Sequence, residues 1–397
     1  MPDKFPFMKH INFKKLLPHL IAIVVFIIIA IVYCKPALEG KVLNQHDTQG
    51  WKGMAQQSFE VKERTGHFPL WTNSMFGGMP TYQIMLDANT NIAQPIGYFV
   101  KALSLGLPEP ASFFFLACIC FYFLCIVAGA NAWVSMLGAL AYAYATYNPV
   151  IIGAGHNTKM LSMAYAPVVL AGMLLIFQKK YIIGFAITAL FAYIFIGQNH
   201  LQIVYYTLII ALCFAIAFII KSFKEGEAAH ALKSVSLALV AGIIGLASCA
   251  VIIMPTYEYA KQTMRGGVSQ LTLNKDSKTN KTKGGLDKDY AFRWSMGKME
   301  TFTFMVPGLY GGSNGGNEHS ASAKMVEKLT EMGVPEENAL GMTNAYSYWG
   351  SMSSTSETTS GPAYLGAVIC FLFIFGLFYV KSWHKWWLIS ASLIGII

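Results

Sequence analysis

Charged residues are scarce in this chain of 397 residues: 12% are Asp, Glu, Lys or Arg, whereas 55% are hydrophobic. Soluble domains carry about 25% charged residues, so this composition excludes an ordinary soluble protein and indicates a polytopic membrane protein. The formal net charge is +9. Most basic residues flank hydrophobic runs, as topology signals do, instead of forming a stripe in a soluble domain. We therefore expect no nucleic-acid partner.

Cysteine is also sparse. The chain has seven, and the long polar stretches 36–110 and 255–361 contain none. This absence excludes a disulfide framework and a zinc site in those stretches. We also expect no cofactor, and a divalent cation at an acidic residue is the disfavoured alternative.

Hydrophobic runs are what the chain has in abundance. A membrane-spanning helix needs about 20 apolar residues, somewhat fewer when neighbours shield it. We expect all-α architecture, with spans near 18–35, 111–129, 132–152, 160–178, 181–198, 201–220, 232–254 and 362–380. A ninth run starts near 386 and is still apolar at Ile397, so we expect the chain to be truncated inside that span.

These runs divide the chain into five segments. Residues 1–35 form a cytoplasmic segment and the first transmembrane helix, which has no cleavage site and so is expected to stay as a signal anchor. Residues 36–110 form a first outer loop, and 111–254 hold six transmembrane helices with short loops. Residues 255–361 form a second large outer loop, and 362–397 hold one helix and the incomplete span.

The lysines of the short connections predict the orientation of the helices. If the spans alternate, these lysines share one side, and short-loop lysines favour the cytoplasm: Lys4 to Lys15, Lys179 and Lys180, Lys221 and Lys224, Lys381 and Lys385. The N-terminus is then cytoplasmic. The outer face receives both long loops and the turns at 155–159 and 198–202.

The long loops also contain local structure. Residues 50–63 place apolar side chains at helical spacing and predict an amphipathic helix at the membrane interface. Residues 320–339 predict a pair of small helices, the second beginning at Pro335. The polar stretch 274–289 predicts a flexible loop.

One acidic residue stands out in the first outer loop. Asp47 lies in the run Asn44–Gln49, just beyond the first span. A carboxylate there suits a general base that deprotonates an acceptor hydroxyl, or a ligand for a divalent cation. The alternative is structural, with Asp47 capping a helix that starts near Thr48.

Two polar turns lie on the same predicted face. His156 and Lys159 open one helix, and His200 opens another. Helix starts present free N–H groups that favour anions, so these side chains are candidates for binding a lipid-linked phosphate or pyrophosphate. The alternative is that they are ordinary loop ends.

Further candidates extend this site. Arg265 is a possible phosphate clamp. The candidates for binding substrate are Gln49, Trp71, Gln202, Tyr205, Glu258 and Trp349. A belt of interfacial aromatic and charged side chains is the competing account of Glu258, Arg265 and Trp349.

Several motifs, spread in order over nearly the whole chain, resemble the YfhO family of bacterial membrane proteins. They are the early-loop Asp47, the Leu70-Trp71 pair, and the runs 77–83, 155–160, 198–206, 306–312, 348–350 and 360–367. The resemblance implies a GT-C-like transmembrane helix bundle with two large outer-face loops. It also implies a bacterial cytoplasmic (inner) membrane protein, and family members are usually much longer than this chain.

The function implied by the resemblance is sugar transfer. GT-C glycosyltransferases take a sugar from a polyprenyl-phosphate donor, and the acceptor here would be a cell-envelope polymer or lipid. An acidic residue of the first outer loop is catalytic in that class, and Asp47 occupies its place. The class often pairs two acids there, whereas this chain has Gln45-His46-Asp47. We therefore expect a metal-independent base and no metal ligands.

Two other functions remain open at the level of sequence. A transporter or flippase of lipid-linked sugars would carry ionisable groups near the bilayer midplane, where this chain has few. A non-catalytic envelope assembly protein would use the large outer loops to bind partners. The sequence favours an enzyme over both.

Overall fold

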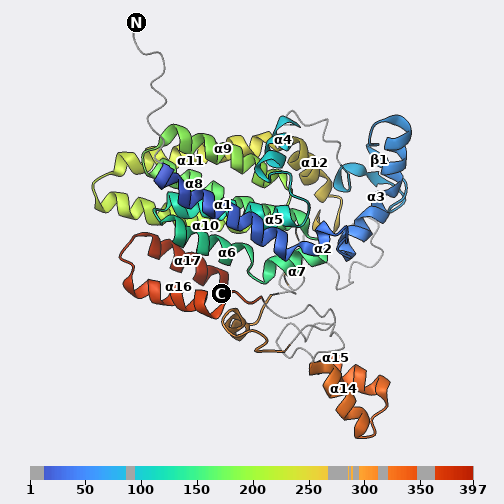
Figure 1. The fold of residues 1–397 in the computed structure, drawn as a ribbon. Coiled ribbons are helices and arrows are strands. Elements are labelled where there is room, and N and C mark those ends of the chain that lie inside the picture. The colour runs from blue at the N-terminus through green and yellow to red at the C-terminus, as the bar shows by residue number, and fades with distance from the viewer. Residues whose placement is uncertain are drawn as a thin grey trace. The chain divides into compact units, whose positions relative to one another are not determined.

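The structure is a computed structural model that describes residues 13–85, 94–266, 285, 288, 295–311, 321–346 and 363–396 (Figure 1). These residues are mostly helical and divide into two compact units. The first unit contains residues up to Tyr144, then 148–255 and 386–388. The second contains 145–147, 256–385 and 389–397.

The first unit is built from a run of helices with one small hairpin. Its helices are α1 (Phe13–Tyr33), α2 (Lys35–Leu38), α3 (His46–Thr65), α4 (Gln94–Leu103), α5 (Ala111–Val127), α6 (Ala132–Ala143), α7 (Tyr147–Ala154), α8 (Asn157–Phe177), α9 (Tyr181–Gly197), α10 (Leu201–Lys224) and α11 (Ala228–Ser248). The hairpin pairs β1 (Trp71–Thr72) with β2 (Met79–Pro80) in antiparallel register and runs into the 3-10 turn η1 (Thr81–Gln83).

The second unit contains shorter elements. They are the 3-10 turns η3 (Met264–Gly266) and η4 (Lys298–Phe304) and the helices α14 (Ala321–Glu331), α15 (Glu336–Tyr346) and α16 (Ala367–Tyr379); α12 (Ala250–Ala260) and α17 (His384–Ile396) contribute residues to both units. The α14–α15 pair confirms the helix pair predicted for 320–339. α14 ends where Val334 N–H bonds Leu329 O and Gly333 has a φ of +86°.

Four of the described helices are long and apolar enough to cross a membrane. They are α1, α8, α10 and α11, each with at least 21 residues. The apolar helices α5 and α9 have 17 residues each, at the lower end of the spanning range. Length and composition thus indicate a helical membrane protein.

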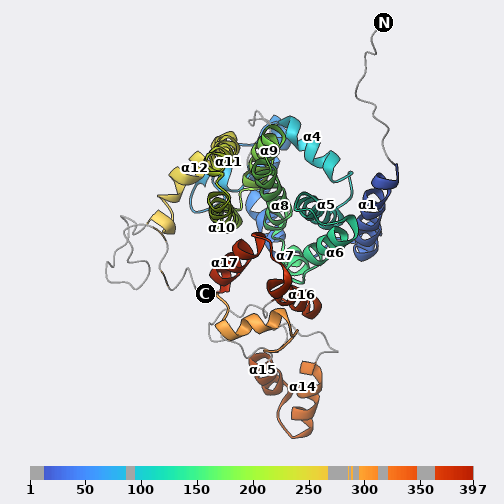
Figure 2. The same ribbon diagram turned by 90° about the vertical axis from the view of Figure 1, so that its left-hand side faces the viewer.

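The centre of the first unit is α8, which contacts α5, α9, α10 and α11 (Figure 2). Its side chains are buried almost all round, including Tyr165 at 0% exposure. Glycines let the neighbours approach, as is usual between membrane helices. A Cβ on Gly172 would lie 2.5 Å from Thr188 Oγ1, and one on Gly184 would lie 2.6 Å from Ile176 N.

Two expected spans are broken in the structure. The run 132–152 divides into α6 and α7, because Pro149 lacks an N–H and its ring would collide with the carbonyl of residue 145 in a continuous helix. The Asn148 amide compensates by donating to Tyr142 O and Ala143 O at the end of α6. The run 232–254 is interrupted at Cys249, between α11 and α12.

The helix predicted over 50–63 is present as α3, which is longer at both ends, and the β1–β2 hairpin packs on it. Gln57 of α3 accepts hydrogen bonds from Thr72 Oγ1 at 2.5 Å and from Asn73 N–H at 3.1 Å. Trp51 Nε1–H donates to Ile84 O at 2.9 Å. These bonds make the segment after the first span a compact element that holds the start of α3 in place.

Candidate functional site

The start of α3 brings Asp47 against the start of α8. His156 Nε2 lies 2.7 Å from Asp47 Oδ2. Because an ionised carboxylate only accepts hydrogen bonds, His156 is the donor. The second oxygen, Oδ1, lies 3.5 Å from His46 Nδ1, at the limit of a hydrogen bond. The side chains of Asp47 and His156 are 52% and 44% exposed, so a ligand can reach both.

The structure does not support the alternative interpretation in which Asp47 caps a helix. Gln45 is the N-cap residue of α3, and Asp47 lies within the first turn. A negative charge there is favoured by the helix dipole, but the side chain is directed to another helix instead of to its own backbone. The sequence run Gln45-His46-Asp47 thus belongs to a helix start and not to a free loop.

Gln45 braces this arrangement. Its Nε2 donates to Ile152 O at 2.6 Å and to Asn157 Oδ1 at 3.0 Å, while its Oε1 accepts from Thr48 Oγ1 at 2.9 Å. Gly155 allows the close approach, since its φ is +100° and a Cβ there would lie 2.9 Å from Thr48 Oγ1. The turn between α7 and α8 and the start of α3 therefore form one packed junction.

His200 and Lys159 belong to the same end of the bundle. His200 is the N-cap residue of α10, and Lys159 lies in the first turn of α8. Burial lowers the pKa of His200 below its usual value, and the nearby charges of Lys159 and His156 lower it further. His200 Nε2 is buried and has no hydrogen-bond partner among the described residues. Buried polar atoms are nearly always bonded, so this nitrogen has unused hydrogen-bonding capacity.

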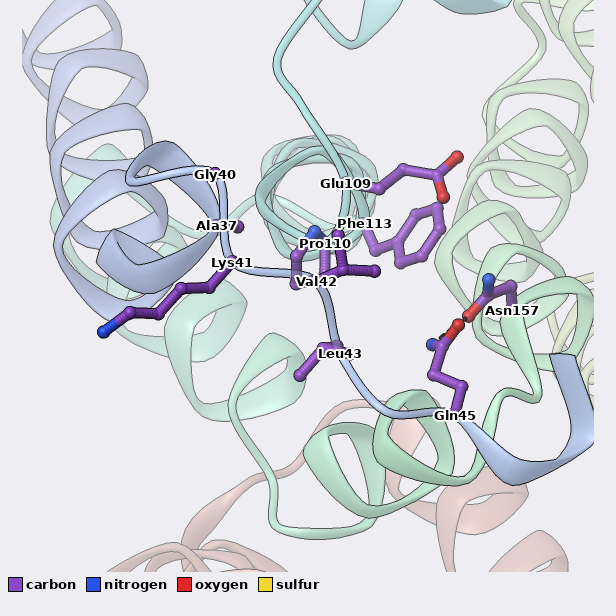
Figure 3. A pocket seen from close by; sticks show the side chains of 10 residues that line it. All are labelled: Ala37, Gly40, Lys41, Val42, Leu43, Gln45, Glu109, Pro110, Phe113 and Asn157. Atoms are coloured by element: carbon purple, nitrogen blue, oxygen red, sulfur yellow. Dashed lines mark hydrogen bonds between the residues drawn. The ribbon is translucent and has the colours of Figure 1, made fainter. Parts of the chain in front are cut away.

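A cavity of about 260 Å³ adjoins the junction (Figure 3). Its polar lining comes from Gln45, Asn157, Glu109 and Lys41, and Phe113 forms part of its apolar wall. The Gln45 and Asn157 side chains face each other across their hydrogen bond, and the Lys41 side chain extends away from them. A second cavity of about 260 Å³, with a more apolar lining, shares the 41–43 stretch and includes Tyr33, Phe114 and Ile152.

The predicted substrate-binding residues of the first unit have other partners. Gln49 Nε2 donates to Asn44 Oδ1 at 2.5 Å, and Gln202 Nε2 donates to Tyr206 OH at 3.0 Å. Tyr205 is 62% exposed on α10 and lies against the Tyr206 ring. Trp71 is 55% exposed on β1, with Nε1–H bonded to Asn73 Oδ1. Neither Asp47 nor His156 is among these partners.

The remaining candidates lie elsewhere in the chain. Glu258 in α12 and Arg265 in η3 belong to the second unit and are exposed there. Trp349 lies outside the described residues, as does nearly all of the predicted flexible loop 274–289. Among the described residues, no three His, Cys, Asp or Glu side chains are grouped so that they could hold a metal ion.

Sequence reasoning missed three residues of the site: Gln45, Asn157 and Glu109. Gln45 and Asn157 are sequence neighbours of predicted residues, but their mutual hydrogen bond joins positions 112 residues apart. Glu109 carried a usable signal, since it is an acid between two prolines at the entry to a hydrophobic run.

Comparisons of the chain with protein-family models, with curated proteins and with solved structures find no match. The chemistry of the site therefore rests on its own geometry. His156 and His46 contact the two oxygens of the Asp47 carboxylate, and Lys159 and His156 lie near enough to His200 to act on it electrostatically. A small cavity with an acidic rim adjoins the junction through Gln45 and Asn157.

Proposed function

We propose that this protein is a GT-C-type membrane glycosyltransferase that resembles the YfhO family. It moves a sugar from a polyprenyl-phosphate donor to a cell-envelope acceptor on the outer face of the bacterial cytoplasmic membrane. The observation that carries the proposal is the Asp47–His156 hydrogen bond beside the unpartnered Nε2 of His200. A base and an anion site within one junction are what this transfer requires.

In this mechanism the acceptor hydroxyl gives its proton to Asp47 Oδ1. The acceptor oxygen forms a bond to the anomeric carbon, and the bond from that carbon to the phosphate oxygen breaks. The phosphate leaves with the electron pair and is stabilised by Lys159 and His200. His156 holds Asp47 Oδ2 and so orients Oδ1, whose contact with His46 Nδ1 is long, at 3.5 Å. Trp71 and Tyr205, both in the first unit, are proposed contributors to substrate binding.

Reconstitution tests the proposal directly. Purified protein in proteoliposomes is given undecaprenyl-phosphate-linked radiolabelled glucose and an envelope glycan fraction, and label in the glycan is counted. Wild type should transfer label. Asp47→Asn should lower kcat by about 10²–10⁴-fold, because the amide cannot accept the proton. Unchanged donor binding and thermal stability in the variant would show that the loss is chemical.

Glu60→Gln is the matched control, since Glu60 lies on the same helix and bonds Gln56. It removes the same charge and should transfer as wild type does. Undiminished transfer by Asp47→Asn would remove Asp47 from the mechanism, and movement of intact donor across the bilayer without transfer would replace the enzyme by a flippase.

A further inference from the structure

The cavity beside the Asp47–His156 pair has no role in the mechanism above, yet its chemistry is distinctive. Two polar side chains of its lining have hydrogen-bonding groups that no described residue uses. Asn157 uses its Oδ1 to accept from Gln45, and no described residue bonds its Nδ2. Glu109 is exposed at the rim and forms no ion pair with any described residue. The cavity thus offers an amide donor and a carboxylate acceptor.

Lys41 also lines the cavity, but its ammonium group lies 3.7 Å from Glu39 Oε2, and the other lining residues are mostly apolar. Phe113 is 3% exposed, so its ring is a fixed wall, and Val42, Leu43 and Pro110 complete that side. An apolar aromatic wall with a few placed polar groups is the usual make-up of a small-molecule site. A sugar ring matches it, because its hydroxyls meet the carboxylate and the amide while its C–H face meets Phe113.

Size and charge narrow the ligand further. Ligand pockets of drug-sized molecules are about 300–1,000 Å³, so a cavity of about 260 Å³ has room for one monosaccharide ring. Glu109 repels a carboxylate, and Lys41 extends away from the polar wall. The basic side chains lie at the neighbouring helix starts instead, so phosphate and sugar have separate places.

We infer that the cavity lined by Gln45, Asn157, Glu109 and Phe113 binds one uncharged sugar ring, and that Glu109 discriminates against a uronic acid. This inference rests on the proposed function and adds a sugar-binding site to it. The ring belongs either to the donor or to the acceptor, since both present the same chemistry to these side chains.

A binding experiment tests this without turnover. Saturation-transfer NMR measures the Kd of methyl β-D-glucopyranoside and of methyl β-D-glucopyranosiduronate for the purified full chain. Wild type should prefer the glucoside by about three- to fivefold, the size of an exposed like-charge contact. Glu109→Gln should bring the ratio near one, and Glu109→Lys should invert it.

Two controls keep the result interpretable. Glu60→Gln removes a carboxylate far along α3 from the cavity lining and should leave the ratio as in wild type. Thermal unfolding of each variant confirms that the chain is folded. The inference is overturned if wild type binds neither glycoside, or if the ratio is the same in wild type, Glu109→Gln and Glu109→Lys.

A competition arm separates the two sources of the ring. Citronellyl-phosphoryl-glucose is added to the Asp47→Asn variant, which holds the donor analogue without consuming it. Displacement of the methyl glucoside assigns the cavity to the donor sugar, and simultaneous binding assigns it to the acceptor. Glycoside binding is measured without sugar transfer, so the two results are independent. A sugar site is supported even if no transfer is observed, and transfer is supported even if the variants do not change the glycoside Kd ratio.

Discussion

Histidines at the two ends of the helix bundle in the first unit differ in their hydrogen bonding. At the end where α8 stops and α11 starts, His230 is fully engaged. Its Nδ1 lies 2.8 Å from Tyr181 OH and 3.1 Å from Ser234 Oγ, and its Nε2 lies 3.0 Å from Phe177 O. At the other end, His200 leaves a buried Nε2 without a described partner.

We propose from this difference that the His230 end mainly contributes stability and that the His200 end binds the donor. A satisfied network rigidifies the structure around it, and removing one member leaves the others unpaired. Around His230, Lys179 and Glu227 add an ion pair at 2.7 Å, and Lys233 lies over the Tyr181 ring. Around His200, the basic groups Lys159 and His156 lower its pKa instead of pairing with it. Such an arrangement favours an incoming anion.

The largest expected effect comes from breaking the Asp47–His156 pair. Asp47→Ala and His156→Ala should each lower kcat, by about 10²–10⁴-fold for Asp47 and by less for His156. Residues that act as a unit are not additive, so the double variant should be no worse than Asp47→Ala. Initial rates in proteoliposomes measure this. Additive losses would mean that His156 acts independently of Asp47, for example on the phosphate.

A matched pair of histidine substitutions sharpens the comparison of the two ends. His230→Gln should lower the free energy of unfolding by about 1–3 kcal/mol, because Tyr181, Ser234 and Phe177 O lose their shared partner. His200→Gln should change stability little but weaken donor binding about tenfold. Denaturant unfolding and donor titration measure the two quantities. If both variants lose stability equally, the contrast between the ends is wrong.

The pH dependence of donor binding tests His200 more finely. Its pKa is lowered in the free protein, first by burial and then by Lys159 and His156, so it is neutral near pH 7. An anionic phosphate raises that pKa, so binding takes up a proton and should tighten as the pH falls from about 7.5 to about 6. The donor phosphodiester does not titrate in this range.

The stability of the ligand-free protein should move in the opposite direction. The unfolded chain takes up the proton first as the pH falls through the ordinary His value of about 6.5, so the folded state loses stability below it. His200→Gln should remove most of the pH dependence of both donor binding and stability. His156→Gln should keep the part of that dependence that comes from His200. A donor Kd that does not vary with pH in wild type would contradict this account.

Much of the helical framework follows from the sequence alone, and so do the helix starts at His156 and His200. Pro149 carried the signal for the break between α6 and α7, which the hydrophobic run concealed. The structural alternative in which Asp47 caps the helix is not seen, because local sequence cannot distinguish a helix cap from a first-turn residue whose partner is 109 positions away. The cavity at Glu109 and the buried Nε2 of His200 also arise from long-range packing, so no local sequence pattern predicts them.

The smallest expected effect comes from a pair of lysine substitutions that differ only in the end they occupy. Lys179 and Glu227 are both substantially exposed, and their hydrogen bond raises the pKa of Lys179. Exposed ion pairs contribute little, and salt screens them, so Lys179→Met should leave donor Kd unchanged and shift Tm within error at high salt. Lys159→Met removes the same charge beside His200 and should weaken donor binding severalfold. Equal donor Kd values for the two variants would mean that Lys159 contributes no more to donor binding than Lys179 does. Lys159 would then be removed from the proposed phosphate site.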